Sequence, residues 1–266
     1  MRILSLFLAC LAFPTSAHEL WIEPLEWQVS ADGTVQAEIV NGEGFEGVKL
    51  PYLSQRIARF EIVAGDTRAE VEGRMGDRPA LNRPALAEGL NILVYEAVPM
   101  TLNYESFDKF QRFVDHKALG DVLPRHMARG LPLMNFEEVY SRHAKSLIAA
   151  GTGEGADREI GLETEIVALA NPYTDDLSAG LPVLLLYQGA PRAGEQVEIF
   201  EKAPGGEVAI TTVLTDGEGV AVIPVRPGHA YQLDAVVLRE PSAAMAEASG
   251  AVWETLWANL TFAVPG

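Results

Sequence analysis

Short runs in which apolar and polar residues alternate are the feature that most restricts the fold of this chain. Leu20 and Ile22 alternate with Glu19, Trp21 and Glu23. A period of two sends successive side chains to opposite faces, which is typical of a β-strand with one buried face. Further strand-like runs cover residues 28–39, 59–63, 91–95, 163–169, 181–187, 196–201, 208–215, 220–224, 231–238 and 253–262. Glycine-rich turn clusters separate them, so the pattern predicts a mainly β protein built from β-sandwiches.

One segment departs from this pattern. Phe107, Phe110, Phe113 and Val114 recur at helical spacing, and Pro124 interrupts or restarts a second helical piece. We therefore expect a short helical insertion near residues 104–130.

The segment after the insertion allows two interpretations. Asn135 precedes Glu138 by three residues, which resembles a capping box at the start of a helix. Residues 140–150 could equally form a strand, and the sequence does not separate the two.

A glycine-rich stretch at 151–155 has the composition of a linker. We place a domain boundary there. The prediction is a β-rich domain at 18–150, which carries the helical insertion, and a β-sandwich domain at 156–266.

The first 17 residues have the order of a secretory signal peptide. Arg2 supplies a positive charge, residues 3–13 form an apolar run, and small residues lead to Ala17. The run is too short for a membrane anchor, which needs about 20 apolar residues, and lipoprotein processing at Cys10 would cut the run nearly in half. We expect cleavage after Ala17, no membrane span afterwards, and a soluble periplasmic or secreted protein that starts at His18.

Composition narrows the chemistry. Cys10 is the only cysteine and would leave with the signal, so disulfides, cysteine metal sites and thiol catalysis are excluded from the mature chain. The chain has 37 acidic and 20 basic residues, a net charge of −17. Such a protein repels phosphate backbones, so nucleic acid is not an expected partner. The same charge favours either solubility or the gathering of cations.

His18 is the sharpest candidate for chemistry. Cleavage would give it a free α-amine, and the amine and the imidazole Nδ1 can together chelate Ni²⁺, Co²⁺ or Cu²⁺. The α-amine has a pKa of about 8, so a metal displaces its proton readily at neutral pH. The alternative is that His18 is only the first residue of an edge strand. The other histidines, His116, His126, His143 and His229, show no pair with ligand spacing, and strand alternation turns Glu19 and Glu23 away from the His18 side chain.

Several motifs point to one family. The most specific are residues 18–24, directly after the signal, 76–80 and 140–147, with support from 169–173, 191–197 and 215–219. Together they resemble a bacterial periplasmic family, the domain of unknown function 4198, formerly named after the nickel-transport subunit NikM. The resemblance covers nearly the whole mature chain.

The resemblance implies a periplasmic protein associated with nickel or cobalt uptake, with components of a metal-uptake transporter as partners. It also implies that the C-terminal domain is similar to prealbumin-like or carboxypeptidase-regulatory-like sandwiches. His143 lies in the motif at 140–147 and becomes the leading second ligand. The predicted metal ligands are therefore His18, His143 and His116, for a nickel or cobalt ion.

Known enzyme motifs are missing from the sequence. It contains no Gly-x-Ser-x-Gly elbow, no His-Glu-x-x-His and no phosphate-binding Gly-x₄-Gly-Lys-Ser/Thr, so we expect a protein that is not an enzyme. Two alternatives stay open. One is a sandwich module that recognises protein or glycan, in which Trp253 and Trp257 either stack on a sugar or pack inside. The other is a copper protein with an N-terminal histidine brace.

The export prediction is direct to test. Mass spectrometry of the protein from a native-like envelope fraction should find His18 as the N-terminal residue. Recovery of acylated Cys10, or of a chain that keeps residues 1–17, would contradict it.

Overall fold

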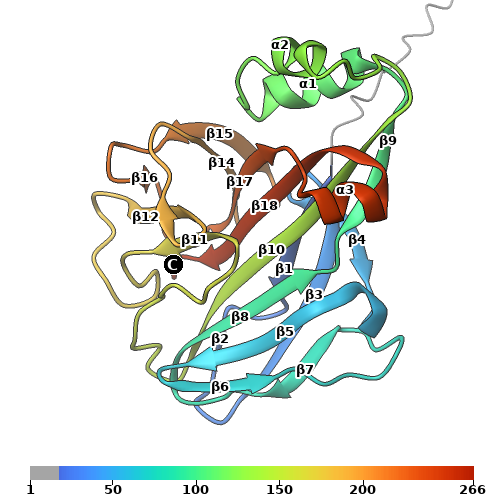
Figure 1. Ribbon diagram of the computed structural model, residues 1–266. Helices are drawn as coiled ribbons and strands as arrows, with labels where there is room; N and C mark the ends of the chain where they lie inside the picture. Colours follow the sequence, from blue (N-terminus) through green and yellow to red (C-terminus); the bar gives the residue numbers. More distant parts are fainter. Residues whose placement is uncertain (1–17) are drawn as a thin grey trace, which may run out of the picture.

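The computed structural model describes residues 18–266 and is mainly β, as the alternating runs predict. Three sheets and a small helical cap make up the fold (Figure 1). The predicted signal peptide at 1–17, with Cys10, lies outside the described residues. Within residues 18–266, no helix has the length and apolar character needed to cross a membrane.

The first sheet is antiparallel and contains the N-terminal strand. Its strand order is β1-β3-β4, and β7 also pairs with β3. The strands are β1 (Glu19–Pro24), β3 (Thr34–Glu43), β4 (Glu46–Leu50) and β7 (Leu81–Pro84). The alternation correctly predicts the strand β1 but not its burial, because both faces are covered: Leu20 and Ile22 enter one hydrophobic core, and Trp21 packs in a separate cluster.

The second sheet runs through the whole molecule. Its order is β15-β14-β17-β18-β10-β8-β5-β6, and β2 and β9 also pair with β10. The strands are β2 (Gln28–Val29), β5 (Ile57–Ala64), β6 (Thr67–Glu70), β8 (Gly89–Ala97), β9 (Met100–Tyr104), β10 (Phe136–Ala150), β14 (Gln196–Lys202), β15 (Val208–Leu214), β17 (Ala230–Arg239) and β18 (Ala251–Ala263).

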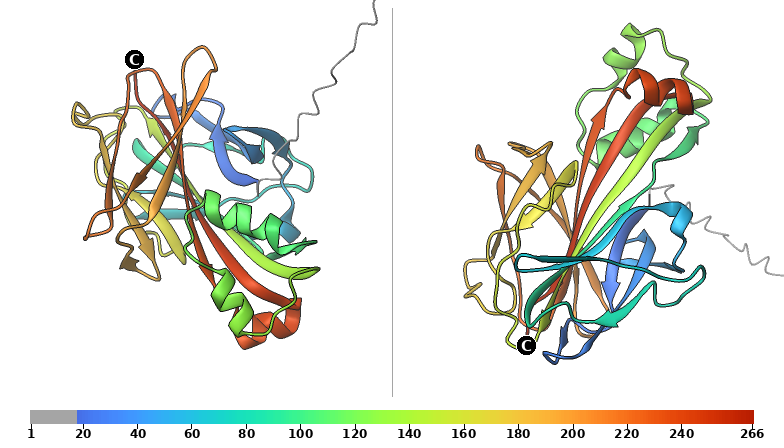
Figure 2. Two further views of the ribbon diagram at one scale, coloured as in Figure 1. Left: turned by 90° about the horizontal axis from the view of Figure 1, so that it is seen from above. Right: turned by 60° about the horizontal axis from the view of Figure 1, so that its bottom comes forward.

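The third sheet covers the opposite face of this central sheet. It joins β11 (Thr164–Ala168), β12 (Leu181–Tyr187), β13 (Ala190–Pro191) and β16 (Val220–Ile223). Strand β8 shows the two-sided burial directly. Ile92 and Val94 pack with the third sheet, whereas Leu93 and Tyr95 pack with the first. The central sheet therefore lies between two layers, a sandwich arrangement that Figure 2 shows from two further directions.

Strand β10 decides between the two interpretations of the segment after the insertion. The strand interpretation of 140–150 is confirmed, and Asn135 takes a left-handed φ of 54° just before the strand instead of capping a helix. Strand β10 pairs in parallel with β18 on one side and antiparallel with β8 and β9 on the other. Both of its faces are buried, so the sequence lacks a clean alternation of polar and apolar residues.

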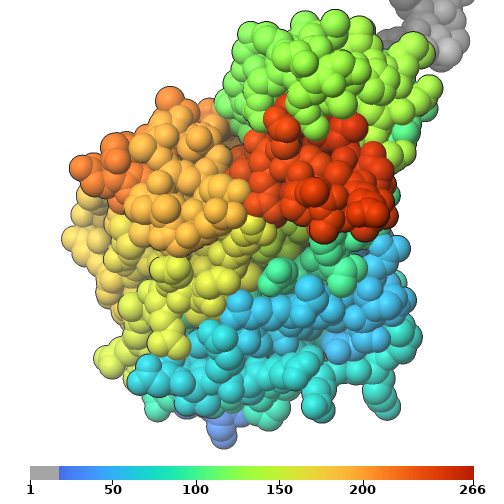
Figure 3. Space-filling model, in the orientation of Figure 1, coloured from blue at the N-terminus to red at the C-terminus, as the bar shows by residue number. Residues whose placement is uncertain are grey.

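The helical insertion forms where predicted. Helices α1 (Phe107–His116) and α2 (Leu123–Ala128) lie between β9 and β10, and Pro124 occupies the first turn of α2, where its missing N–H costs nothing. The apolar face of α1 packs on Trp253 and Trp257 of β18. In Figure 3 this segment lies against the C-terminal segment with α3 (Ala243–Ser249). The sequence patterns do not predict α3 or the short 3-10 turn η1 (Ser54–Arg56).

The predicted boundary at 151–155 does not separate two sheets. Strands from both sides of it join in the central sheet, through the pairing of β10 with β18. The glycines serve the geometry of a packed turn, because Gly151 and Gly153 have φ values of 60° and 67°. The amide of Asn171 donates to the carbonyls of Gly153 and Gly155 at 2.8 and 2.9 Å. A glycine-rich composition predicts flexibility, but here it closes a turn.

A variant of Asn171 tests this turn. Replacing Asn171 by Ala removes three hydrogen bonds, leaves the two carbonyls without a donor and the backbone N–H of Tyr173 without its acceptor, so we expect the free energy of unfolding to fall by about 1–3 kcal/mol. Urea denaturation measures the change. The matched control is Asn103→Ala, which removes an exposed hydrogen bond to Glu137 and should cost well under 1 kcal/mol. Equal losses in the two variants would contradict a structural role for the turn.

Candidate functional site

A buried ion cluster lies where β1, β14 and β17 meet the end of α1. Lys117 Nζ lies 3.0 Å from Glu19 Oε1, 2.6 Å from Glu198 Oε2 and 3.0 Å from Asp234 Oδ2. All four residues are buried. One oxygen from each carboxylate lies within 4.8 Å of the others, a spacing that could also hold a metal ion. We call these four residues the Lys117 cluster.

Strand geometry brings the carboxylates together. Glu198 of β14 and Asp234 of β17 are direct cross-strand partners, so their side chains share one face of the central sheet. Glu19 reaches the same face from β1. Lys117 follows the last residue of α1, and its backbone N–H donates to the carbonyl of Phe113. The cluster therefore forms only when β1, β14, β17 and the end of α1 are packed together.

Burial governs the charges of the cluster. Removal from water raises the pKa of Glu19 to about 7 despite the attraction of Lys117, and it raises the pKa of Asp234 as well. For Glu198, burial also favours the neutral form, but hydrogen bonds from His116 and Lys117 outweigh it and lower its pKa. Burial opposes the charge of Lys117, yet the surrounding carboxylates raise its pKa overall. The cluster therefore holds a charged lysine, an ionised Glu198 and a Glu19 that titrates near neutral pH.

One of the predicted ligands, His116, contacts this cluster, and the backbone of another, His18, adjoins it. His116 Nε2 lies 3.2 Å from Glu198 Oε1, on the carboxylate that Lys117 also contacts. The hydrogen bond that the His116 ring donates to the Glu198 carboxylate raises the pKa of His116. His18 is exposed and directly precedes Glu19, and its Nδ1 lies 3.5 Å from Asn41 Nδ2. The structure thus brings the segments that carry His18 and His116 to one set of carboxylates.

Arg142 holds the backbone of His18. Its Nη2 donates to the carbonyl oxygen of His18 at 2.7 Å. The guanidinium lies over the rings of Tyr140 and Trp257, at 4.7 and 4.0 Å from their centroids. Burial lowers the pKa of Arg142, and its Nε and Nη1 atoms have no hydrogen-bond acceptor among the described residues.

Other buried polar atoms around the cluster also lack partners in the described part of the chain. They are Glu19 Oε2, Asp234 Oδ1, Ser146 Oγ and both amide atoms of Asn259 and Gln232. Asn259 is the cross-strand neighbour of Asp234. Buried polar groups normally have partners, which can be water or a bound ion. The unpartnered carboxylate oxygens Glu19 Oε2 and Asp234 Oδ1, with the His116 imidazole beside Glu198, are donor types that a divalent transition metal accepts.

His143 lies elsewhere. It follows Arg142 in β10, so its side chain points to the opposite face of the sheet. It is 2% exposed, and its Nε2 lies 3.9 Å from Glu96. Burial lowers its pKa to about 4, so it stays neutral at physiological pH. The structure does not bring His143 to the site of His18 and His116.

The two remaining histidines already have protein partners. His126 Nδ1 accepts a hydrogen bond from Trp253 Nε1 at 3.0 Å, and its Nε2 lies 2.9 Å from the carbonyl of Pro132. His229 Nδ1 lies 2.9 Å from Glu201. Trp253 and Trp257 are both buried, so they pack inside the protein and form no exposed sugar platform.

Sequence reasoning missed Lys117, Glu198, Asp234 and Arg142. A weak signal exists: Glu198 and Asp234 are charged residues inside predicted apolar strands. That signal does not say whether the charged face of a strand meets water or a second layer.

The comparison with protein families finds a match to a family whose description states no activity. A family model described as a domain of unknown function, DUF4198, matches residues 15–239. No curated protein matches the sequence.

The raised pKa of Glu19 predicts how stability changes with pH. The folded state favours the protonated carboxyl, so this contribution is fully present below the ordinary value of 4.5 and is lost as pH rises to about 7. We expect the free energy of unfolding of Glu19→Gln to fall less between pH 4.5 and 8 than that of the wild type. Urea denaturation across this range measures it. Glu46→Gln, at an exposed position of β4, should follow the wild type; a Glu19→Gln curve parallel to the wild type would contradict the assignment.

Proposed function

Since the chain belongs to the DUF4198 family, whose description states no activity, we propose its function from its geometry: it binds a divalent transition metal, nickel or cobalt, at its processed N-terminus. One observation carries the proposal. His18 and His116, 98 residues apart, belong to segments that meet at the same carboxylates, through the contacts of Lys117 with Glu19 and Glu198.

Three residues would hold the metal. His18 offers its α-amine and Nδ1 after cleavage, His116 offers Nε2, and Glu198 offers the Oε1 atom that His116 now contacts. Amine and imidazole nitrogens with one carboxylate suit nickel and cobalt better than magnesium or calcium, which prefer oxygen ligands. The His116 side chain is 51% exposed, so a metal can reach it from solvent.

Protons compete with the metal at this site. The α-amine and both imidazoles must be neutral to bind, and Glu198 raises the pKa of His116. We therefore expect affinity to fall as pH drops through the titration range of these groups.

The role that follows is capture and delivery, without turnover. The net charge of −17 concentrates cations near the surface, and exposed ligands can release the metal to a partner. The partner of this proposal is a component of a metal-uptake system. The same N-terminal nitrogens would also suit copper, which is the second candidate.

Calorimetric titration of the protein that begins at His18, with Ni²⁺, Co²⁺, Cu²⁺ and Zn²⁺, tests the proposal. His18→Ala removes the imidazole, and an added Gly-Ser converts the α-amine to an amide. Each change should weaken nickel binding at least about tenfold, which corresponds to about 1.4 kcal/mol. His116→Ala should weaken it by a similar factor.

His229→Ala is the matched control, because His229 lies beside Glu201 and away from the Lys117 cluster. It should leave the affinity unchanged. Equal binding by the extended and processed forms would exclude an N-terminal site. Tight binding of copper alone, with redox activity, would replace the nickel or cobalt assignment by the copper one.

A further inference from the structure

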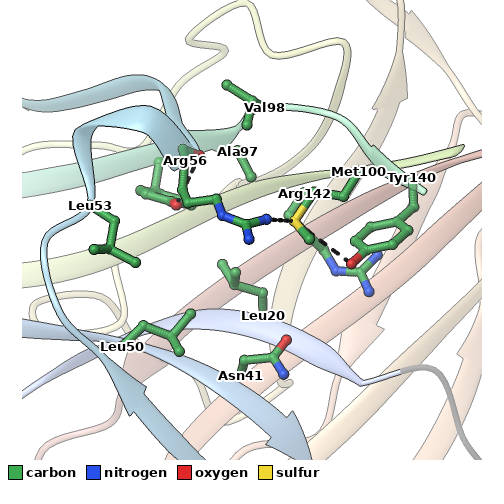
Figure 4. Close-up of a pocket in the computed structure, with 11 residues that line it drawn as sticks. Leu20, Asn41, Leu50, Leu53, Arg56, Ala97, Val98, Met100, Tyr140 and Arg142 are labelled. Atoms are coloured by element: carbon green, nitrogen blue, oxygen red, sulfur yellow. Dashed lines mark hydrogen bonds between the residues drawn. The ribbon is translucent and has the colours of Figure 1, made fainter. Parts of the chain in front are cut away.

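A cavity of about 270 Å³ lies beside the N-terminal strand, between β1, the β4–β5 connection and the β8–β9 turn (Figure 4). Its walls include Leu20, Leu50, Leu53 and Val98. The volume is at the small end for ligand sites, which range from about 300 to 1,000 Å³. The cavity suits the apolar body of a small molecule.

Two polar side chains of this cavity are donors that meet at one sulfur atom. Arg56 Nη1 donates to the thioether sulfur of Met100, and the hydroxyl of Tyr140 donates to the same sulfur at 3.8 Å. Figure 4 shows both side chains directed at Met100 from opposite sides. A thioether is a weak acceptor. Two strong donors thus meet at an atom that satisfies neither of them well.

The charge of the cavity opposes that of the protein. No Asp or Glu lines it, although the chain has 37 acidic residues. Arg56 and Arg142, which both line it, form no ion pair with a described carboxylate within 4.0 Å. The two buried lysines behave differently: Lys117 contacts three carboxylates, and Lys145 contacts Asp157 and Glu165.

We propose that this cavity binds a small organic anion, a carboxylate with an apolar body. The carboxylate accepts hydrogen bonds from Arg56 and from the Tyr140 hydroxyl in place of the Met100 sulfur. The apolar part packs against Leu20 and Leu53. The site is distinct from the metal ligands proposed above and needs no metal.

Electrostatics supports an anion over a neutral ligand. Charge-assisted hydrogen bonds from a guanidinium are about twice as strong as neutral ones. The buried guanidinium of Arg142, behind the Tyr140 ring, adds positive potential that the nearby carboxylates of Asp234, Glu138 and Glu19 offset only in part, since none of them forms an ion pair with it. Apolar walls lower the local dielectric and strengthen both effects.

The experiment is a calorimetric titration of the metal-free protein that begins at His18, in the presence of EDTA. The probes are 3-phenylpropanoate and its neutral analogue 3-phenylpropan-1-ol, which share an apolar body. The acid should bind saturably, and the alcohol should bind at least about tenfold more weakly. Arg56→Gln should weaken binding of the acid about tenfold and leave the alcohol unchanged, while Tyr140→Phe should weaken the acid several-fold.

The matched control is Arg112→Gln, which removes the same charge from an exposed arginine of α1 that does not line the cavity. It should leave both affinities unchanged. Absence of saturable binding of the acid to the wild type overturns the proposal. So does equal affinity for acid and alcohol, or an equal loss in Arg56→Gln and Arg112→Gln. Because EDTA removes metals, these outcomes are independent of the nickel titration.

Discussion

The ammonium of Lys117 is the point on which the arrangement of this protein depends. It contacts carboxylates from β1, β14 and β17, so it ties the N-terminal strand and the end of the helical insertion to the C-terminal half of the central sheet. Taking an ion from water costs several kcal/mol, which close partners must offset. The three strands and the end of α1 must therefore be positioned so that Lys117 meets all three carboxylates. His18 and His116 are each adjacent in sequence to a member of the cluster, and the His116 ring also contacts Glu198.

Strand β10 is the second constraint, because it is buried on both faces. Arg142 lies on the face that meets β1, and Lys145 lies on the opposite face with Asp157 and Glu165. Consecutive strand residues point to opposite sides, so two separate polar systems share one strand. This explains why His143, one residue from Arg142, lies away from the N-terminal site.

Arg142 also divides two chemical environments. On one side its Nη2 donates to the carbonyl of His18, near the acidic Lys117 cluster. On the other side it lines a cavity that no Asp or Glu lines and in which Arg56 and Tyr140 are donors. The first environment favours cations and the second favours anions.

Much of the local structure follows from the sequence. Alternation predicts β1, a continuous apolar run predicts β12, and helical spacing predicts α1, because all three patterns depend on neighbours a few residues apart. The DUF4198 resemblance, carried by short motifs, is confirmed as well. Contacts between distant segments do not follow from such patterns. A glycine-rich stretch is compatible with a linker or a packed turn, and Asn171 makes 151–155 a turn. A charged residue in a strand can lie on a face that is exposed to solvent or on one that a second layer buries. Only the pairing of β14 with β17, and the layer that β1 adds above them, buries Glu198 and Asp234 and brings Glu198 to His116 instead of to His143.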